Sequence, residues 1–487
     1  MSPTSIAETL AAAGLQAQLL LPTDAEYIAR QDSYWSNSVK TLQPAAILRP
    51  KSAEEVSSTL KALVATDTKF AIRSGGHMQF PGANNIGPEG VTIDLGLMDW
   101  TRFHPGGGEK TVDIGPGGRW GKVYTTLQNL EGGKYVVAGG RDGNVGVAGL
   151  LLGGGKTYFT AKRGFACDDV VEYEVVLSDG RIVKATAEEN EDLFRALKGG
   201  GSNFGVVTNF RMKAFELGQI WGGMSFYPKT VIPEATKALV AFTDRMHEDV
   251  ESNLLSFFMY APEFKDIVVA SAFVQIRGDE KAPAYKEWLE LPSVLSTCKP
   301  TTLLDIATEY AVAPQGYYDT FVTACFKNDA RIVTKATEIH NQLVEDLKVL
   351  IPDGNFITQC LFQPLPQVIG ERSIASGGNV LGVENHPTNG LLLVAVGMVK
   401  TVEQEAFLAP RLTAWVQAVR DFAAALEGGD ANLDFTYMNY SDASQNPLES
   451  YGRKNVDRLR SVAAKYDPDQ VFQKLCPGGF KVSAVKS

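Results

Sequence analysis

Two glycine-rich stretches contain the residues whose types and spacing could do chemistry. The first, Arg73-Ser-Gly-Gly-His77, comes directly after a short apolar stretch. Adjacent glycines let backbone N–H groups converge into a concave site for an anion such as a pyrophosphate. A plain turn that ends in a surface histidine is the alternative interpretation.

The second stretch runs from Gly139 to Gly155 and has eight glycines separated mainly by branched apolar residues. The whole chain has 47 glycines, and their clusters are concentrated between Gly75 and Gly205. Glycine lets another group approach the backbone closely, so the pattern predicts a surface packed face to face with a flat or extended ligand. A glycine run with a purely structural purpose is the alternative.

Several common motifs fail to match. The segment Gly115-Pro-Gly-Gly-Arg-Trp120 departs from the dinucleotide-binding GxGxxG, and Leu150 stands where a GxxxxGK[ST] phosphate loop needs its first glycine. A serine-hydrolase GxSxG is missing. The five cysteines have no CxxC spacing, and no HExxH pattern occurs. We therefore expect no metal site and no disulfide framework, which fits a reducing compartment.

Charge and hydropathy exclude other classes. The 487 residues include 46 Lys+Arg and 56 Asp+Glu, a net charge of −10, which argues against a nucleic-acid partner. An uninterrupted apolar run of about 18 residues is missing, so a transmembrane helix is not expected. The N-terminus has no basic segment before its apolar residues and reads as an amphipathic helix rather than a signal peptide. We expect a cytoplasmic protein without a membrane partner.

The elements that must position these residues fall into two groups, with a boundary near 215–220. Up to about residue 215, strands mix with helices, and Ser52 with Glu55 predicts a capped helix start. A hairpin is predicted around Ser178-Asp-Gly180. The expected strands cover 44–48, 69–73, 91–95, 111–115, 170–177, 181–185 and 206–210.

Residues 220–430 alternate strand-like runs with longer helical segments, which predicts an antiparallel sheet covered by helices on one face. The expected strands cover 220–227, 254–259, 267–275, 320–326 and 391–399, and the expected helices 231–247, 330–350 and 403–426. A strand-like segment at 433–440 and a helix at about 448–465 follow. The predicted class is α+β, with domains 1–218 (core about 40–215) and 219–430, and a returning segment 431–487.

Five sequence blocks together resemble a known family. They are RSGGH at 73–77, AGGRDGNVGVAGLLLGGG at 138–155, GFACDDVVEYEVVLSDG at 164–180, DLFRALKGGGSNFGVVTNF at 192–210, and YMNY at 437–440 with the later DP at 467–468 and VF at 471–472. They resemble the berberine-bridge-enzyme-like flavoprotein oxidases, which have the vanillyl-alcohol-oxidase (PCMH) type of FAD-binding fold. The resemblance covers nearly the whole chain and is strongest to fungal secondary-metabolite oxidases.

The resemblance implies that FAD is the cofactor and that His77 is bonded covalently to the flavin. Many members add a second bond from a cysteine, and this chain has Asp142 at that position, so one bond is expected. The other residues implied to contact FAD are Arg73, Ser74, Gly75 and Gly76 at the pyrophosphate, Gly139, Gly140, Gly143, Gly146, Gly149, Gly153, Gly154 and Gly155 along the cofactor, Gly205, Val206 and Val207 at the adenine end, and Asn439.

The resemblance also implies the chemistry. Tyr440 is the expected general base, Asn439 orients the flavin or Tyr440, and Tyr437 is the second candidate for the base. A phenol has a pKa of about 10, so Tyr440 would need a cationic or hydrogen-bonding neighbour. Two core aromatic residues are the alternative interpretation of the tyrosines. Val145 falls where the family gates oxygen, and a small residue there resembles the oxygen-reactive oxidases.

We therefore expect an FAD-linked oxidase that takes hydride from an alcohol, amine or C–H group of a small molecule, with reoxidation by O2 giving H2O2. The alternatives are an oxidative cyclase, a redox-neutral pericyclase, a flavin dehydrogenase and a flavin-free binding protein. Lys156 and Arg163 depart from the family pattern, and we expect surface charges there; a place facing the flavin or substrate is the alternative. The expected assembly is a monomer or a weak homo-oligomer.

Overall fold

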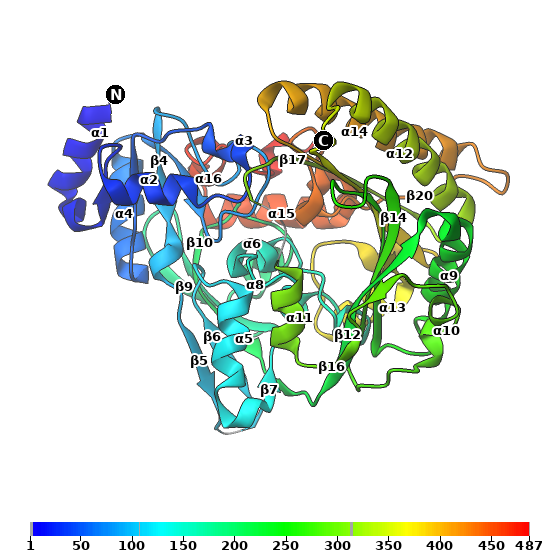
Figure 1. The fold of residues 1–487 in the computed structure, drawn as a ribbon. Coiled ribbons are helices and arrows are strands. Elements are labelled where there is room, and N and C mark those ends of the chain that lie inside the picture. Colours follow the sequence, from blue (N-terminus) through cyan, green and yellow to red (C-terminus); the bar gives the residue numbers. More distant parts are fainter. Residues whose placement is uncertain (1–2, 107, 312–314, 487) are drawn as a thin grey trace.

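The computed structural model describes residues 3–106, 108–311 and 315–486. Figure 1 shows two parts side by side: the first half of the chain with small sheets, and the later residues with one large sheet and long helices. The C-terminal helices return to the first part. The predicted α+β class is confirmed.

The first part begins with a four-stranded sheet of order β1-β2-β4-β3. Strands β2 and β3 pair in parallel with β4, and α4 connects them. Ser52 caps α4 as predicted, while the Glu55 carboxylate accepts from the N–H of Lys51 instead of Ser52. The bounds are β1 Leu19–Leu20, β2 Ala46–Leu48, β3 Lys69–Arg73, β4 Gly90–Asp94, α1 Pro3–Leu10, α2 Ala25–Asp32, α3 Asn37–Lys40 and α4 Ala53–Ala65.

A five-stranded sheet of order β5-β6-β10-β8-β9 follows, and the predicted β8–β9 hairpin is present. The short pair β7–β11 completes this part. The strands are β5 Thr101–His104, β6 Thr111–Ile114, β7 Tyr135–Val136, β8 Val170–Val176, β9 Ile182–Ala185, β10 Val206–Lys213 and β11 Phe215–Glu216. The helices are α5 Trp120–Gln128, α6 Val147–Leu152, α7 Thr160–Arg163 and α8 Glu191–Leu197.

The large sheet is antiparallel, with order β15-β12-β14-β13-β18-β19-β17-β20 and β16 paired to β12. Its strand β18 was not predicted, because Gln359, Gln363 and Pro364 interrupt the apolar pattern. The strands are β12 Ile220–Pro228, β13 Ser252–Tyr260, β14 Ile267–Gln275, β15 Leu295–Ser296, β16 Lys299–Thr301, β17 Tyr318–Lys327, β18 Ile357–Leu365, β19 Gly390–Val399 and β20 Asn432–Leu433.

Three long helices cover one face of this sheet: α9 Ile232–Arg245, α12 Ala330–Leu350 and α14 Val402–Ala424 (Figure 1). Their apolar residues form one core with Phe258, Cys360 and Phe362, while Phe257 and Leu361 belong to the core shared with the first part. The sheet therefore turns alternate side chains toward the helices and toward the first part. Three further helices are α10 Lys286–Leu289, α11 Leu303–Tyr310 and α13 Gln367–Ala375.

The last segment corrects two predictions. Residues 433–440 do not form an alternating strand: β20 ends at Leu433, and Met438–Tyr440 is a single 3-10 turn. The predicted helix 448–465 is a short turn at Pro447–Tyr451 followed by α15 Arg453–Tyr466, separated by Gly452 at φ +81°. Helix α16 Val471–Lys474 ends the series, and no helix in the described ranges is long and apolar enough to cross a membrane.

Candidate functional site

The two glycine-rich stretches meet at Gly75 and Gly146. A Cβ built on Gly75 would lie 2.5 Å from the Cα of Gly146, so neither position has room for a side chain. Arg119 joins the two loops, because its guanidinium donates to the carbonyl of Gly75 at 2.8 Å and also to the carbonyl of Asn144. The Ser74 hydroxyl donates to the carbonyl of Pro116 at 2.6 Å.

The side chain of Arg73 is turned away from this junction. It is fully buried, and its guanidinium donates to the carbonyl of Arg30 at 2.5 Å and to the hydroxyl of Ser33 at 2.7 Å. It also lies 3.7 Å over the ring of Tyr34. These groups lie in or beside α2. Only the backbone of Arg73 is therefore left to contact a pyrophosphate.

His77 is held by stacking rather than by hydrogen bonds to other side chains. Its ring lies parallel to that of Trp35, with centroids 4.8 Å apart and an angle of 5° between planes. Phe321 of β17 packs edge-on against Trp35, and the backbone N–H of Trp35 donates to the carbonyl of Gly76 at 3.2 Å. Burial, and then the charge of Arg119, lower the pKa of His77 to about 3. The imidazole is therefore neutral at physiological pH, the nucleophilic form.

The second stretch packs partly against protein. A Cβ on Gly139 or Gly140 would lie within 2.4 Å of the ring of Trp120, which is fully buried. A Cβ on Gly143 would come 3.1 Å from the carbonyl oxygen of Ala307 in α11. At Gly149, which is exposed, a Cβ would meet no described atom within 4 Å. The surface beside Gly149 is therefore open to a ligand, whereas the other three glycines also serve protein packing.

The end of this stretch is fixed by the turn that contains the predicted catalytic residues. The hydroxyl oxygen of Tyr437 accepts from the N–H of Gly155 at 3.1 Å, the N–H of Lys156 at 2.7 Å and the Asn439 side chain at 3.1 Å. A Cβ on Gly153 would lie 1.9 Å from the Asn439 Oδ1. Burial, and then the neighbouring phenol of Tyr440, raise the pKa of Tyr437 above its ordinary value. Tyr437 therefore anchors the turn.

Tyr440 has the neighbours that the sequence analysis required for a base. Its hydroxyl oxygen accepts from Arg141 at 2.8 Å and from the Nε2 of Gln363 at 3.1 Å. Arg141 also donates to the Oε1 of Gln363 at 2.9 Å, which closes a triangle of hydrogen bonds. Arg141 is therefore the cationic neighbour of Tyr440, and Gln363 is its hydrogen-bonding neighbour.

Lys156 is not a surface charge, and that expectation is wrong. The residue is 5% exposed, and its ammonium donates to the carbonyl of Pro364 at 2.7 Å, next to Gln363 in β18. Burial, and then the charge of Arg141, lower the pKa of Lys156 to about 7. Lys156 therefore belongs to the same site as Tyr440.

Asp142 and Val145 lie in the turn that follows Arg141. The Asp142 carboxylate accepts from the N–H of Asn144 at 2.7 Å, and burial raises the pKa of Asp142 to about 6. Val145 is half-buried against the core, and its carbonyl accepts from the N–H of Trp120 at 3.1 Å. Its predicted influence on oxygen stays a prediction.

Of the three residues predicted at the adenine end, Gly205 directly precedes β10, and Val206 and Val207 are its first two residues. A Cβ on Gly205 would lie 2.5 Å from the side chain of Val175, and Val206 and Val207 pair with residues of β8. Both valines are buried in hydrophobic cores. Their contact with a ligand stays a prediction.

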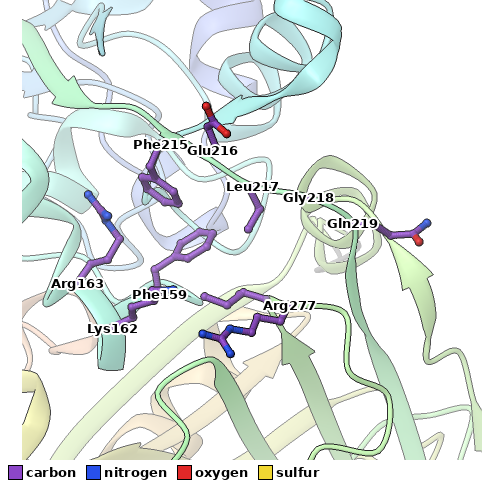
Figure 2. Close-up of a pocket in the computed structure, with 10 residues that line it drawn as sticks. Phe159, Lys162, Arg163, Phe215, Glu216, Leu217, Gly218, Gln219 and Arg277 are labelled. Atoms are coloured by element: carbon purple, nitrogen blue, oxygen red, sulfur yellow. The ribbon is translucent and has the colours of Figure 1, made fainter. Parts of the chain in front are cut away.

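Arg163 lies in a separate pocket of about 460 Å³ at the junction of the two parts (Figure 2). Residues 217–219, which connect β11 to β12, form part of its wall. Arg163 lies 4.0 Å over the ring of Phe215 and is paired with Asp169 at 2.6 Å. Lys162 and Arg277 also line this pocket, and both are paired with Glu251.

Sequence reasoning missed Arg141, Gln363, Trp35 and Arg119. Arg141 stands between two glycines of a noted motif, which was the available signal. Nothing in the local sequence marks Gln363 or Trp35. Across the described ranges, no group of three or more His, Cys, Asp or Glu side chains could hold a metal ion.

Comparisons with known proteins agree with this geometry. The family model "FAD binding domain" matches residues 44–186, and "Berberine and berberine like" matches residues 436–474. The "FAD-dependent monooxygenase drtC" of Aspergillus calidoustus is 37% identical over 95% of this chain and 87% of its own length. The "FAD-dependent monooxygenase sdcF" of Emericella nidulans is 35% identical over 96% of both chains.

A solved structure, the xylooligosaccharide oxidase of Myceliophthora thermophila in complex with xylobiose, has a TM-score of 0.77 at 20% identity over 99% of this chain and 100% of its own. That likeness shows the shared fold and confirms the predicted PCMH-type arrangement. FAD is the cofactor of the matched domain family. The residues of this chain fit FAD, because the loops meet at Gly75 and Gly146, the surface at Gly149 is open and the imidazole of His77 is stacked and neutral. The chain belongs to the berberine-bridge-enzyme-like family of FAD-linked oxidoreductases.

Proposed function

We propose that this chain is an oxidase that removes two hydrogens from a small organic molecule and returns the electrons to O2 as H2O2. The bound flavin would accept the substrate hydride and later reduce O2, and the chain would supply binding, orientation and proton transfer. The observation that carries the proposal is the 2.8 Å contact between Arg141 and the Tyr440 hydroxyl, on a turn packed against the second glycine stretch.

In this proposal Tyr440 takes the proton of the substrate. The guanidinium of Arg141 and the amide of Gln363 stabilise the negative oxygen that would remove the proton. Tyr437 is the weaker candidate because three donors already bind its oxygen and its side chain is 1% exposed.

We further propose that His77 forms the single covalent bond to FAD. The neutral ring has a free nitrogen, because it makes no hydrogen bond to another described residue, and the stack on Trp35 fixes its plane. Asp142 at the second position has no sulfur to form another bond. The chemistry in a solved relative supports a histidyl link: a glucooligosaccharide oxidase of Acremonium strictum, 19% identical with a TM-score of 0.76, is titled with a "6-s-cysteinyl, 8 alpha-N1-histidyl FAD".

Acid precipitation of the purified protein tests the covalent bond. We expect yellow pellets from the wild type and flavin released to the supernatant from His77→Ala. Flavin that stays in the pellet in His77→Ala would overturn the assignment. Oxygen uptake with stoichiometric H2O2 during turnover then tests the oxidase, and an isomeric product without oxygen uptake would instead indicate a pericyclase.

A monooxygenase is the second candidate, because the relatives at 37% and 35% identity carry that name. Turnover under ¹⁸O2 separates the two activities. An oxidase releases the label as peroxide, whereas a monooxygenase places one labelled atom in the product.

A further inference from the structure

The site around Tyr440 contains cations without a carboxylate partner. Arg141 makes no ion pair with any residue that the structure describes. The carboxylate of the adjacent Asp142 accepts from the N–H of Asn144, and the cation that acts on it is Arg119 rather than Arg141. Lys156, which is buried, has a backbone carbonyl as its acceptor. Arg141 is half-buried, and a guanidinium that is partly removed from water without a carboxylate beside it points to a missing anion. Lys156 adds a second basic group close to it.

Arg141 keeps donors free for that anion. Both hydrogen bonds of the Arg141 side chain, to Tyr440 and to Gln363, come from one nitrogen, Nη2. Its Nε and Nη1 have no acceptor among the described residues. The Nε–H lies on the edge of the guanidinium that it shares with Nη2, and Nη1 lies on the other side, so each free nitrogen can donate separately to one charged oxygen of a carboxylate, an acidic enol or a phenol.

Two unpartnered hydroxyl groups lie close by. The hydroxyls of Tyr158 and Tyr310 are buried without a hydrogen-bond partner, and their rings are 6.2 Å apart. The charge of Arg141 acts on both phenols, which places them in its neighbourhood. A polar group of a ligand bound beside Arg141 would give these hydroxyls a partner.

The facing surface of the large sheet is apolar. Phe257 pairs with Leu361, and Met259 pairs with Gln359, on the face that belongs to the core shared with the first part. Phe257, Met259 and Phe321 are only partly buried. Such a wall binds an apolar skeleton, while a few polar groups fix its orientation.

We propose that this site takes organic anions: the substrate's negatively charged oxygen binds Arg141 beside Tyr440, and its apolar skeleton lies against Phe257, Met259 and Phe321. The inference rests on the proposed function, because it names the substrate class for the same site. A carboxylate and an acidic enol share the required chemistry, and separate probes distinguish them.

The test is a titration of the purified flavoprotein, followed by the visible spectrum of its flavin. The carboxylate probe is benzoate against neutral benzamide, and the enolate probe is dimedone against its neutral methyl enol ether. At about pH 8, we expect one anion or both to bind at least about tenfold more tightly than the matched neutral molecule, as a charged hydrogen bond provides. The probe with the larger preference identifies the source of the charge.

The preference must depend on Arg141. We expect Arg141→Gln to remove it, Arg141→Lys to retain part of it, and the control Arg277→Gln, in the junction pocket, to leave it unchanged. Flavin content and circular dichroism establish that each variant is folded.

Equal binding of charged and neutral probes overturns the proposal, as does a preference that survives in Arg141→Gln or an absence of binding by all four probes. If Arg141→Gln changed the flavin reduction potential but kept the anion preference, the charge of Arg141 would act on the flavin rather than on the substrate. That result would also overturn the proposal. The titration needs no turnover. The oxidase proposal fails separately, if photoreduced enzyme gives no H2O2 in air. The two failures can therefore be told apart.

Discussion

Two groups of cations lie where the first part of the chain meets the large sheet, and they differ in their partners. Figure 2 shows Arg163, Lys162 and Arg277 in the junction pocket. Arg163 is paired with Asp169, and Lys162 and Arg277 share Glu251. Around Tyr440, Arg141 and Lys156 have hydroxyl, amide and carbonyl oxygens as partners but no carboxylate among the described residues.

The difference separates structural charges from charges available to a ligand. Lys162 of α7 and Arg277, which follows β14, are both paired with Glu251, and the Lys162 pair joins the two parts without needing anything else. Arg141 is half-buried without a carboxylate, so an anion bound there would supply the charge that it lacks. Lys156 has no carboxylate either, and burial lowers its pKa to about 7. A cation's partners, rather than its presence, therefore indicate its use.

Removal of the Tyr440 hydroxyl is expected to have the largest effect. Tyr440→Phe keeps the ring and deletes the atom that Arg141 and Gln363 bind. We expect the rate of flavin reduction to fall by about 10²–10⁴-fold, the usual contribution of a general base. Anaerobic stopped-flow measurement with a substrate found by oxygen uptake provides the rate. A loss below about tenfold, with a larger loss in Tyr437→Phe, would transfer the role to Tyr437.

Disruption of a pair in the junction pocket is expected to affect stability instead. Arg163→Gln leaves the carboxylate of Asp169, whose side chain is 4% exposed, without its cation. We expect the free energy of unfolding to fall by about 3 kcal/mol. Urea unfolding measures this loss, and the rate of flavin reduction in the folded variant should stay within about twofold of wild type. A large loss of rate at unchanged stability would contradict the structural role of this pair.

The fold was largely predictable because its elements have regular patterns. The strands of the large sheet alternate or are wholly apolar, and its covering helices repeat at helical spacing. Strand β18 escaped because Gln359, Gln363 and Pro364 break its pattern. One of these polar residues, Gln363, donates a hydrogen bond to the hydroxyl of Tyr440. The strand was thus missed for the same reason that it contributes to the site.

The site was predictable only where a local motif marks it. Residues 73–77 and 437–440 have family signatures, but Arg141 and Tyr440 are 299 residues apart, and Gln363 and Tyr440 are 77 apart. No periodicity reports such contacts. Lys156 was assigned to the surface because lysine is rarely buried, and that general tendency gives way where a site binds charge.

Lys156 offers a test of the unpaired group through the pH dependence of stability. Its pKa is lowered from the ordinary lysine value of 10.5 to about 7 in the folded protein, so between these values the unfolded chain binds the extra proton. Stability of the wild type therefore rises with pH across that window, and the cost is fully present below about pH 7. Lys156→Met should raise the free energy of unfolding by about 2 kcal/mol below pH 7.

Urea unfolding at about pH 6 and about pH 9 checks this expectation, since the gain should shrink at the higher value. A gain that is equal at both values would mean that Lys156 has no abnormal titration. A loss at both values would mean that its contact with the Pro364 carbonyl outweighs the cost of its charge.

The smallest effect is expected at Arg277, whose side chain is 72% exposed. Exposed ion pairs contribute little, because water screens the charges and both side chains lose freedom. Arg277→Gln should change the free energy of unfolding by less than about 0.5 kcal/mol, because Lys162 still pairs with Glu251 in this variant. Anion binding should stay unchanged. If Arg277→Gln instead weakened benzoate binding about tenfold, the anion would occupy the junction pocket, and the division between paired and unpaired cations would fail.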